Sequence, residues 1–160
     1  MNTKYKKYIS LMLWVFALIF IGSVIGSSTK TGVSTWYKDL NRSPLSPPNY
    51  LFGIVWTILY AMIGASGFLM WQNQHFPRLR LIKILYVVQL ILNFSWTPLF
   101  FSYHLVGTSL LCIILMRTLV ACMIYLSYEK IRTVSILMIP YLFWLLFATY
   151  LNFYIWQNNY

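Results

Sequence analysis

The chain has 160 residues, of which 60% are hydrophobic, 19% aromatic and only 9% charged. An ordinary soluble domain carries about 25% charged residues, and a chain of this length could not hide so much apolar surface from water. The composition excludes a disordered chain and indicates one domain in a bilayer. The 12 Lys and Arg residues exceed the 2 Asp and Glu residues by 10 charges. They lie in short runs between apolar stretches, which is typical of membrane topology and argues against nucleic-acid binding.

A helix that spans a bilayer needs about 20 mostly apolar residues. Five stretches meet this requirement, at 8–25, 51–71, 84–103, 106–125 and 134–156. They predict an all-α integral membrane protein, a bundle of five transmembrane helices that forms a single membrane domain over residues 1–160. The first stretch follows three lysines and also resembles a secretory signal. It is longer than the usual apolar signal core of about 7–15 residues, so we interpret it as a retained span.

The distribution of Lys and Arg predicts the orientation. The N-terminus and the second and fourth loops together hold eight of these residues, whereas the first loop holds three. The positive-inside rule then places the N-terminus in the cytoplasm of a bacterial cell, with the protein in the cell membrane. Arg117 is the one cation deep in a span, where a charge is costly. It could snorkel to an interface, bond to backbone carbonyls, or meet an anionic ligand or lipid, and the sequence leaves these three alternatives open.

The first loop, residues 26–50, combines Trp36 and Tyr37 with three prolines, Pro44, Pro47 and Pro48. Proline fixes the backbone angle φ and lacks an N–H donor, so this segment is predicted to be ordered and non-helical. The aromatic rings fit an anchor at the boundary between water and lipid. They also fit a lid over a cavity between the helices, because ordered loops of this length are usually functional.

Aromatic, amide and small side chains recur at helical spacing on the second, third and fifth spans. The residues on these faces are Trp56, Tyr60, Gly67, Gln89, Asn93, Trp96, Trp144, Ala148 and Asn152. An amide without a partner in lipid costs several kcal/mol, about the value of a lost hydrogen bond, so these amides are expected to point inward. They either bond between helices or, together with the flat rings, line a cavity for a flat and mostly apolar ligand.

Other chemistry has little support in the sequence. No group of His, Cys and acidic residues has the spacing of metal ligands, and only Asp39 and Glu129 are acidic, so a paired acid and base is not expected. Cys112 and Cys122 are ten residues apart, about 15 Å along a helix, which is too far for a disulfide. His75 and His104 lie at span ends, where interfacial positions are expected. We therefore predict no metal site and no required cofactor.

The order of these residues resembles the translocator protein family, whose bacterial members are called tryptophan-rich sensory proteins. The matching motifs are Trp36-Tyr37, Leu40, Pro44, Pro47-Pro48, Phe52, Val55-Trp56-Thr57, Leu59-Tyr60, Gly64, Gln89-Leu90, Leu92-Asn93, Trp96, Phe100-Phe101, Pro140-Tyr141, Trp144, Phe147-Ala148, Leu151-Asn152 and Trp156. The resemblance covers nearly all of the chain from Trp36 onward.

The resemblance implies a five-helix bundle, usually a homodimer, with a ligand pocket beneath the first loop. The family binds porphyrin-type tetrapyrroles, in their transport, sensing or regulation, and its mitochondrial members bind cholesterol and benzodiazepine-type drugs. The ligand-binding positions here, with Tyr60 added from its shared face, are Tyr37, Pro47, Trp56, Tyr60, Asn93, Trp96, Trp144, Ala148 and Leu151. The alternative function is enzyme-like, light- and oxygen-dependent breakdown of porphyrin, for which Trp56 and Trp144 are the candidate residues.

Two departures from the family pattern change the expectations. The family's cholesterol motif needs a Lys or Arg after Leu151 and Tyr154, but Gln157 stands there, so cholesterol recognition through this motif is doubtful. Some relatives pair through small residues on the third span, where this chain has only Ser95 and Ser102. The pair Gly22 and Gly26 on the first span is therefore a candidate dimer face.

Overall fold

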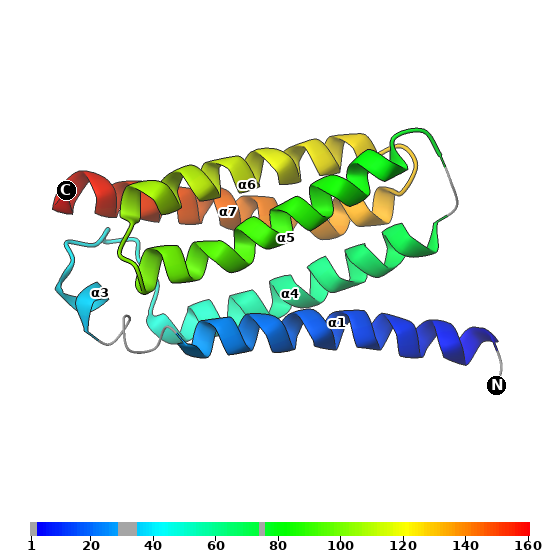
Figure 1. Cartoon of the computed structure of the whole chain (residues 1–160), viewed down its shortest axis with the longest axis horizontal. Coiled ribbons are helices and arrows are strands. Elements are labelled where there is room, and N and C mark those ends of the chain that lie inside the picture. The colour runs from blue at the N-terminus through cyan, green and yellow to red at the C-terminus, as the bar shows by residue number, and fades with distance from the viewer. Residues whose placement is uncertain (1–2, 29–34, 74–75) are drawn as a thin grey trace.

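The computed structural model describes residues 3–28, 35–73 and 76–160, so the expectation for His75 lies outside the described residues. Its helices are α1 (Thr3–Ser28), α3 (Trp36–Asp39), α4 (Asn49–Gln72), α5 (Leu79–Phe101), α6 (Val106–Ser127) and α7 (Arg132–Asn159). The five long helices run side by side, and α3 lies at one end of them (Figure 1). All five are long and apolar enough to cross a bilayer. The predicted all-helical fold with five spans is confirmed.

The helices extend beyond most of the predicted span ends. Helix α5 begins five residues before the expected start of its span, after Arg78, whose φ of 75° lies in the left-handed region. The apolar stretches predict only the part of each helix that lies in the hydrocarbon core of the bilayer, whereas the helical hydrogen bonds continue into the polar boundary. The third span ends earlier than predicted, at Phe101. The amides of Ser102 and Tyr103 both donate to the carbonyl of Pro98, at 3.0 Å, so the helix closes with a wider, π-type turn.

The first loop is not wholly non-helical, and that part of the prediction is wrong. The four residues of α3 form a single helical turn, which sequence periodicity cannot reveal at this length. The turn is stabilised by burial, since Tyr37 is only 5% exposed. The prolines act as expected at the other end of the loop, because α4 begins at Asn49, directly after Pro47 and Pro48.

The helices form a ring in the order α1, α4, α7, α6, α5, and α1 packs far more extensively on α4 than on α5. Glycines allow α1 to approach α4 closely. A Cβ atom at Gly64 would lie 2.9 Å from the backbone oxygen of Trp14, and one at Gly22 would overlap the ring of Tyr60. Both glycines border the cavity, but only Gly22 packs closely within the chain, since Gly26 is exposed and a Cβ there would meet no atom within 4 Å. The expectation that this pair forms a dimer face stays a prediction.

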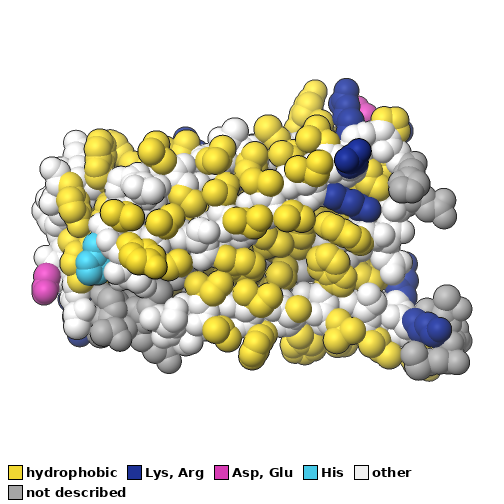
Figure 2. All heavy atoms as spheres, viewed as in Figure 1, with side chains coloured by type: hydrophobic (Ala, Val, Ile, Leu, Met, Phe, Trp, Pro, Cys, Tyr) yellow, Lys and Arg dark blue, Asp and Glu magenta, His cyan; other side chains and the backbone are white. Residues whose placement is uncertain are grey.

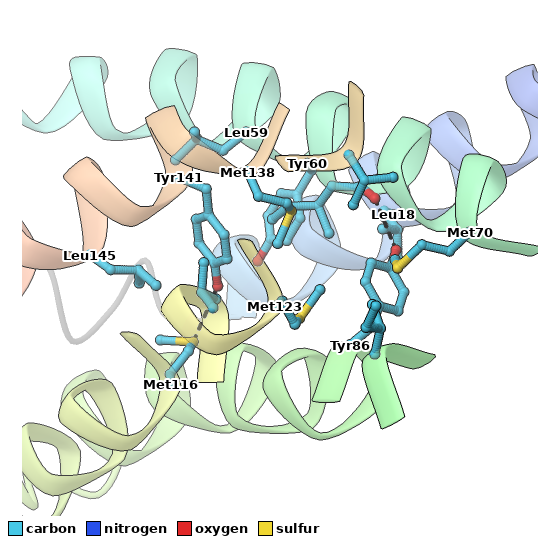
Figure 3. Close-up of a cluster of buried hydrophobic side chains, with 14 of the residues drawn as sticks. Leu18, Leu59, Tyr60, Met70, Tyr86, Met116, Met123, Met138, Tyr141 and Leu145 are labelled. Atoms are coloured by element: carbon cyan, nitrogen blue, oxygen red, sulfur yellow. Dashed lines mark hydrogen bonds between the residues drawn. The ribbon is translucent and has the colours of Figure 1, made fainter. Parts of the chain in front are cut away.

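The surface and the interior both fit a bilayer environment. Figure 2 shows apolar side chains across the middle of the molecule, with Lys and Arg gathered toward the end that carries the N-terminus. The interior is packed with methionine, tyrosine and aliphatic side chains, and Figure 3 shows Met116, Met123, Met138 and Tyr141 within one cluster. Arg117 is half-buried on α6. The chain is thus an integral membrane protein.

Candidate ligand-binding site

A cavity of about 620 Å³ opens inside the bundle near the end where α3 lies. This volume is within the range of about 300–1,000 Å³ that is usual for small-molecule sites. Eight of the nine predicted binding residues line it, namely Tyr37, Trp56, Tyr60, Asn93, Trp96, Trp144, Ala148 and Leu151. Pro47 lies outside the cavity wall and is half-buried in the segment before α4. The structure therefore brings together predicted residues of four helices, α3, α4, α5 and α7, at one site.

Two tryptophans form a corner in the cavity wall. The ring centroids of Trp56 on α4 and Trp144 on α7 are 6.4 Å apart, and the ring planes meet at 85°. Helical rise alone suggests a depth difference of about 8 Å between these residues, but their side chains reach toward one another. The indole nitrogen Nε1 of Trp144 is buried and has no hydrogen-bond partner within the described chain. A flat ligand in the cavity can contact both rings.

Asn93 lies at the centre of a buried chain of hydrogen bonds. The hydroxyl of Tyr60 donates to Asn93 Oδ1 at 2.7 Å, and Asn93 Nδ2 donates to the hydroxyl of Tyr141 at 2.7 Å. Tyr141 in turn has two acceptors within reach, Gln89 Oε1 at 3.1 Å and Met116 Sδ at 3.2 Å, and the second contact is drawn in Figure 3. Asn93 therefore links α4, α5 and α7 while it also borders the cavity.

A second polar cluster surrounds Asn152, which also lines the cavity. Its Oδ1 accepts hydrogen bonds from Trp96 Nε1 at 3.1 Å and from Ser109 Oγ at 3.0 Å. Its Nδ2 donates to the carbonyl of Val106 at 3.1 Å. This amide fixes the plane of the Trp96 ring against α7, so the aromatic wall is rigid before any ligand arrives.

The helical turn α3 is held over one end of the cavity by aromatic contacts. The ring of Tyr37 lies 5.5 Å from that of Phe101, and Trp36 stacks on His104 at 4.1 Å between centroids. The guanidinium of Arg42 lies 5.0 Å above the Tyr37 ring. Burial raises the pKa of the Tyr37 hydroxyl above its usual range, although the charge of Arg42 acts in the opposite direction. Tyr37 is therefore neutral at physiological pH.

Hydrogen bonds to α7 also hold the first loop. The hydroxyls of Ser43 and Tyr150 are 2.9 Å apart. The backbone N–H of Asn41 donates to Asn159 Oδ1 at 2.8 Å, and Asn159 Nδ2 donates back to the Asn41 carbonyl at 3.1 Å. These bonds tie the loop to the C-terminal end of the last helix, which fits a cover more closely than a free surface anchor.

Sequence reasoning missed the contribution of α1 to the cavity. Four small residues of that helix line it, Gly22, Ser23, Gly26 and Ser27. Their spacing was visible in the sequence, but small residues at this spacing also serve helix pairing. Among residues 3–28, 35–73 and 76–160, no three His, Cys, Asp or Glu side chains lie close enough to hold a metal ion.

Comparison with known proteins agrees with the motifs. Residues 13–157 match the TspO/MBR family. The chain belongs to this family. It is 37% identical to the tryptophan-rich protein TspO of Archaeoglobus fulgidus, over 96% of this chain and 97% of the relative. It is 32% identical to the human translocator protein, over 91% of each chain, and 30% identical to the tryptophan-rich sensory protein of Cereibacter sphaeroides, over 89% and 90%. The resemblance inferred from the motifs is confirmed.

Proposed function

We propose that the chain binds porphyrin-type tetrapyrroles in the cavity and acts in their transport, sensing or regulation. The observation that carries the proposal is the corner formed by Trp56 and Trp144 in a mostly apolar cavity. A flat macrocycle suits such a wall, because its face can stack on one of the two perpendicular rings while the other ring packs against its edge. No cofactor is needed for this role, and other flat apolar ligands of the benzodiazepine type fit the same description.

Filling the cavity tests this proposal. Ala148 lines it and is only 8% exposed, whereas Ala121 is exposed on the outside of α6. Protoporphyrin is titrated into the purified full chain in detergent, and quenching of tryptophan fluorescence is followed. We expect Ala148→Phe to abolish saturable quenching and Ala121→Phe to leave it unchanged. Equal quenching in both variants would show that porphyrin binds elsewhere or only dissolves in the micelle.

A second candidate function is light- and oxygen-dependent breakdown of the bound porphyrin. It is favoured by the contact between the two indoles, since a ligand in this corner would lie against two oxidisable rings at once. The bound pigment would absorb the light and dioxygen would be the oxidant. Illumination of the complex with protoporphyrin should then give a new absorbing product. Matched samples in the dark and without oxygen should give none.

Orientation and assembly are parts of the same proposal. The excess of Lys and Arg at the end that carries the N-terminus supports a cytoplasmic N-terminus in a bacterial cell membrane. A membrane-impermeant maleimide should label Tyr160→Cys but not Lys6→Cys on intact cells, in a background in which Cys112 and Cys122 are Ser.

A homodimer is proposed from the family resemblance. The mass of the complex released from nanodiscs would give the number of chains.

A further inference from the structure

A second hollow lies on the outside of the bundle, at the end opposite α3. It is a groove of about 530 Å³ between the end of α4 and the start of α5. Its wall contains Trp71 from α4 and Arg80, Lys83, Ile84, Val87 and Val88 from α5. Ile84 is 49% and Val87 is 45% exposed, so the apolar part of the groove faces the lipid rather than the interior of the protein.

The two cations lie at one end of this groove. Arg80 and Lys83 are three residues apart on α5, so their side chains leave the same face of the helix. Lys83 is half-buried, and its ammonium lies 5.2 Å from the centroid of the Trp71 ring. The chain has only two acidic side chains. Asp39 lies in α3 at the other end of the molecule, and Glu129 lies in the turn between α6 and α7, outside the residues that line the groove. The end of the groove therefore carries two cations, and the residues that line it include no acid.

The apolar part continues from the cations toward the middle of the bilayer. From Arg80 to Val88 the groove runs about 12 Å along α5, given the helical rise of 1.5 Å per residue. Its Trp71 wall is held firmly, because the Trp71 ring lies 5.2 Å from that of Trp14 on α1 and 5.8 Å from that of Tyr86 on α5. The groove thus has a cationic end at the membrane boundary, a rigid aromatic side and an apolar floor.

We propose that this groove binds one anionic glycerophospholipid of the leaflet on the N-terminal side. Its phosphate lies between the charged groups of Arg80 and Lys83, and one acyl chain lies along Ile84, Val87 and Val88. The charge decides the class of lipid, since a zwitterionic choline headgroup brings its own cation toward two positive side chains. The occupant is a lipid because the groove opens to the bilayer and places charge and apolar surface at the depths that a phospholipid has.

Retention of lipids by the full-length protein tests the proposal. The protein is placed in nanodiscs of equal phosphatidylglycerol and phosphatidylcholine, extracted gently, and the lipids that remain bound are counted by native mass spectrometry. We expect the unaltered protein to retain phosphatidylglycerol preferentially. The double variant Arg80→Gln/Lys83→Gln should lower that retention at least about fivefold. The matched control Lys6→Gln/Lys7→Gln removes the same charge from the exposed start of α1 and should retain the lipid.

A third variant tests the apolar part of the groove. Val87→Trp fills it without a change in charge, so we expect it to reduce retention of phosphatidylglycerol as strongly as loss of the cations does. Thermal unfolding identifies any variant that is misfolded. Equal losses in the two charge variants would mean that only the overall positive charge attracts lipid, and the proposal would be wrong. Unchanged retention in folded Val87→Trp would overturn it as well. Neither outcome depends on porphyrin binding.

Discussion

At the scale of single residues, Asn93 shows how one side chain can serve both the bundle and the cavity. The sequence offered two interpretations, a hydrogen bond to ligand or a bond between helices. In the structure, the oxygen and the nitrogen of the Asn93 amide are both hydrogen-bonded to tyrosines of other helices, Tyr60 and Tyr141. The amide still has a second hydrogen and a second lone pair. A direct contact with ligand is therefore an additional role that stays a prediction.

Asn93→Leu should cost stability as well as affinity. The change keeps a similar bulk but removes the acceptor of the Tyr60 hydroxyl and one donor to the Tyr141 hydroxyl, so we expect the free energy of unfolding to fall by about 1–2 kcal/mol. Tyr60→Phe removes only one of these bonds and should cost about half as much. Thermal unfolding and porphyrin titration of both variants measure the two effects. Reduced affinity at full stability would mean that the amide acts mainly on the ligand.

The two tryptophans of the cavity corner allow binding to be separated from photochemistry. We expect Trp56→Phe and Trp144→Phe each to keep most of the porphyrin affinity, because a phenyl ring still stacks on the macrocycle. Both should abolish light-dependent breakdown, because phenylalanine is much harder to oxidise than an indole. Trp156→Phe, on an exposed part of α7, is the control. Full product formation under light in the double variant would remove the tryptophans from the mechanism.

At the scale of the elements, the five spans could be predicted from the sequence, whereas the first loop could be predicted only in part. Apolar length alone identifies each long helix, and Pro47 and Pro48 predict where α4 begins. The turn α3 was not predictable, because four residues carry no periodicity and Tyr37 is held by Phe101, 64 positions away in the chain. Contacts that distant in the sequence leave no local signal.

The prolines before α4 are expected to keep the first loop in its closed form. Pro47→Gly/Pro48→Gly increases the conformational freedom that the open chain must lose, by about 0.4–1 kcal/mol for each residue. Porphyrin affinity should fall by roughly that amount, while the helical circular dichroism signal stays unchanged. An unaltered affinity in the folded double variant would contradict the idea that the loop acts as a lid.

The two glycines of α1 form a matched pair for testing how that helix packs. A Cβ at Gly22 would overlap the ring of Tyr60, whereas one at Gly26 would meet no atom within 4 Å. We expect Gly22→Ala to destabilise the protein by about 1–3 kcal/mol. Gly26→Ala should be neutral, or stabilising by up to about 1 kcal/mol, through helix propensity. If Gly26→Ala instead weakened a dimer in a sedimentation experiment, α1 would contact a second chain.

At the scale of the whole molecule, the cavity depends on the ring order of the helices, which no single span reveals. The inward faces of α4, α5 and α7 were predictable from the spacing of Trp56, Asn93 and Trp144. The closing of the ring by small residues of α1 could not be predicted, because the role of Gly22 depends on the Tyr60 ring that packs against it from another helix. Sequence patterns thus indicate which faces turn inward but not which helices become neighbours.

Because the cavity wall includes α1, α3, α4, α5, α6 and α7, a bound ligand should stabilise the molecule as one unit. A ligand at a free concentration of 100 times its Kd adds about 2.7 kcal/mol to the free energy of unfolding. For a chain of this size that corresponds to a rise in Tm of about 5–10 °C. We expect protoporphyrin to give this rise in the dark, measured by circular dichroism. Ala121→Phe should show the same rise and Ala148→Phe none. A rise in both variants would place the stabilising porphyrin outside the cavity, and a rise that needs light would point to a reaction product as the stabilising species.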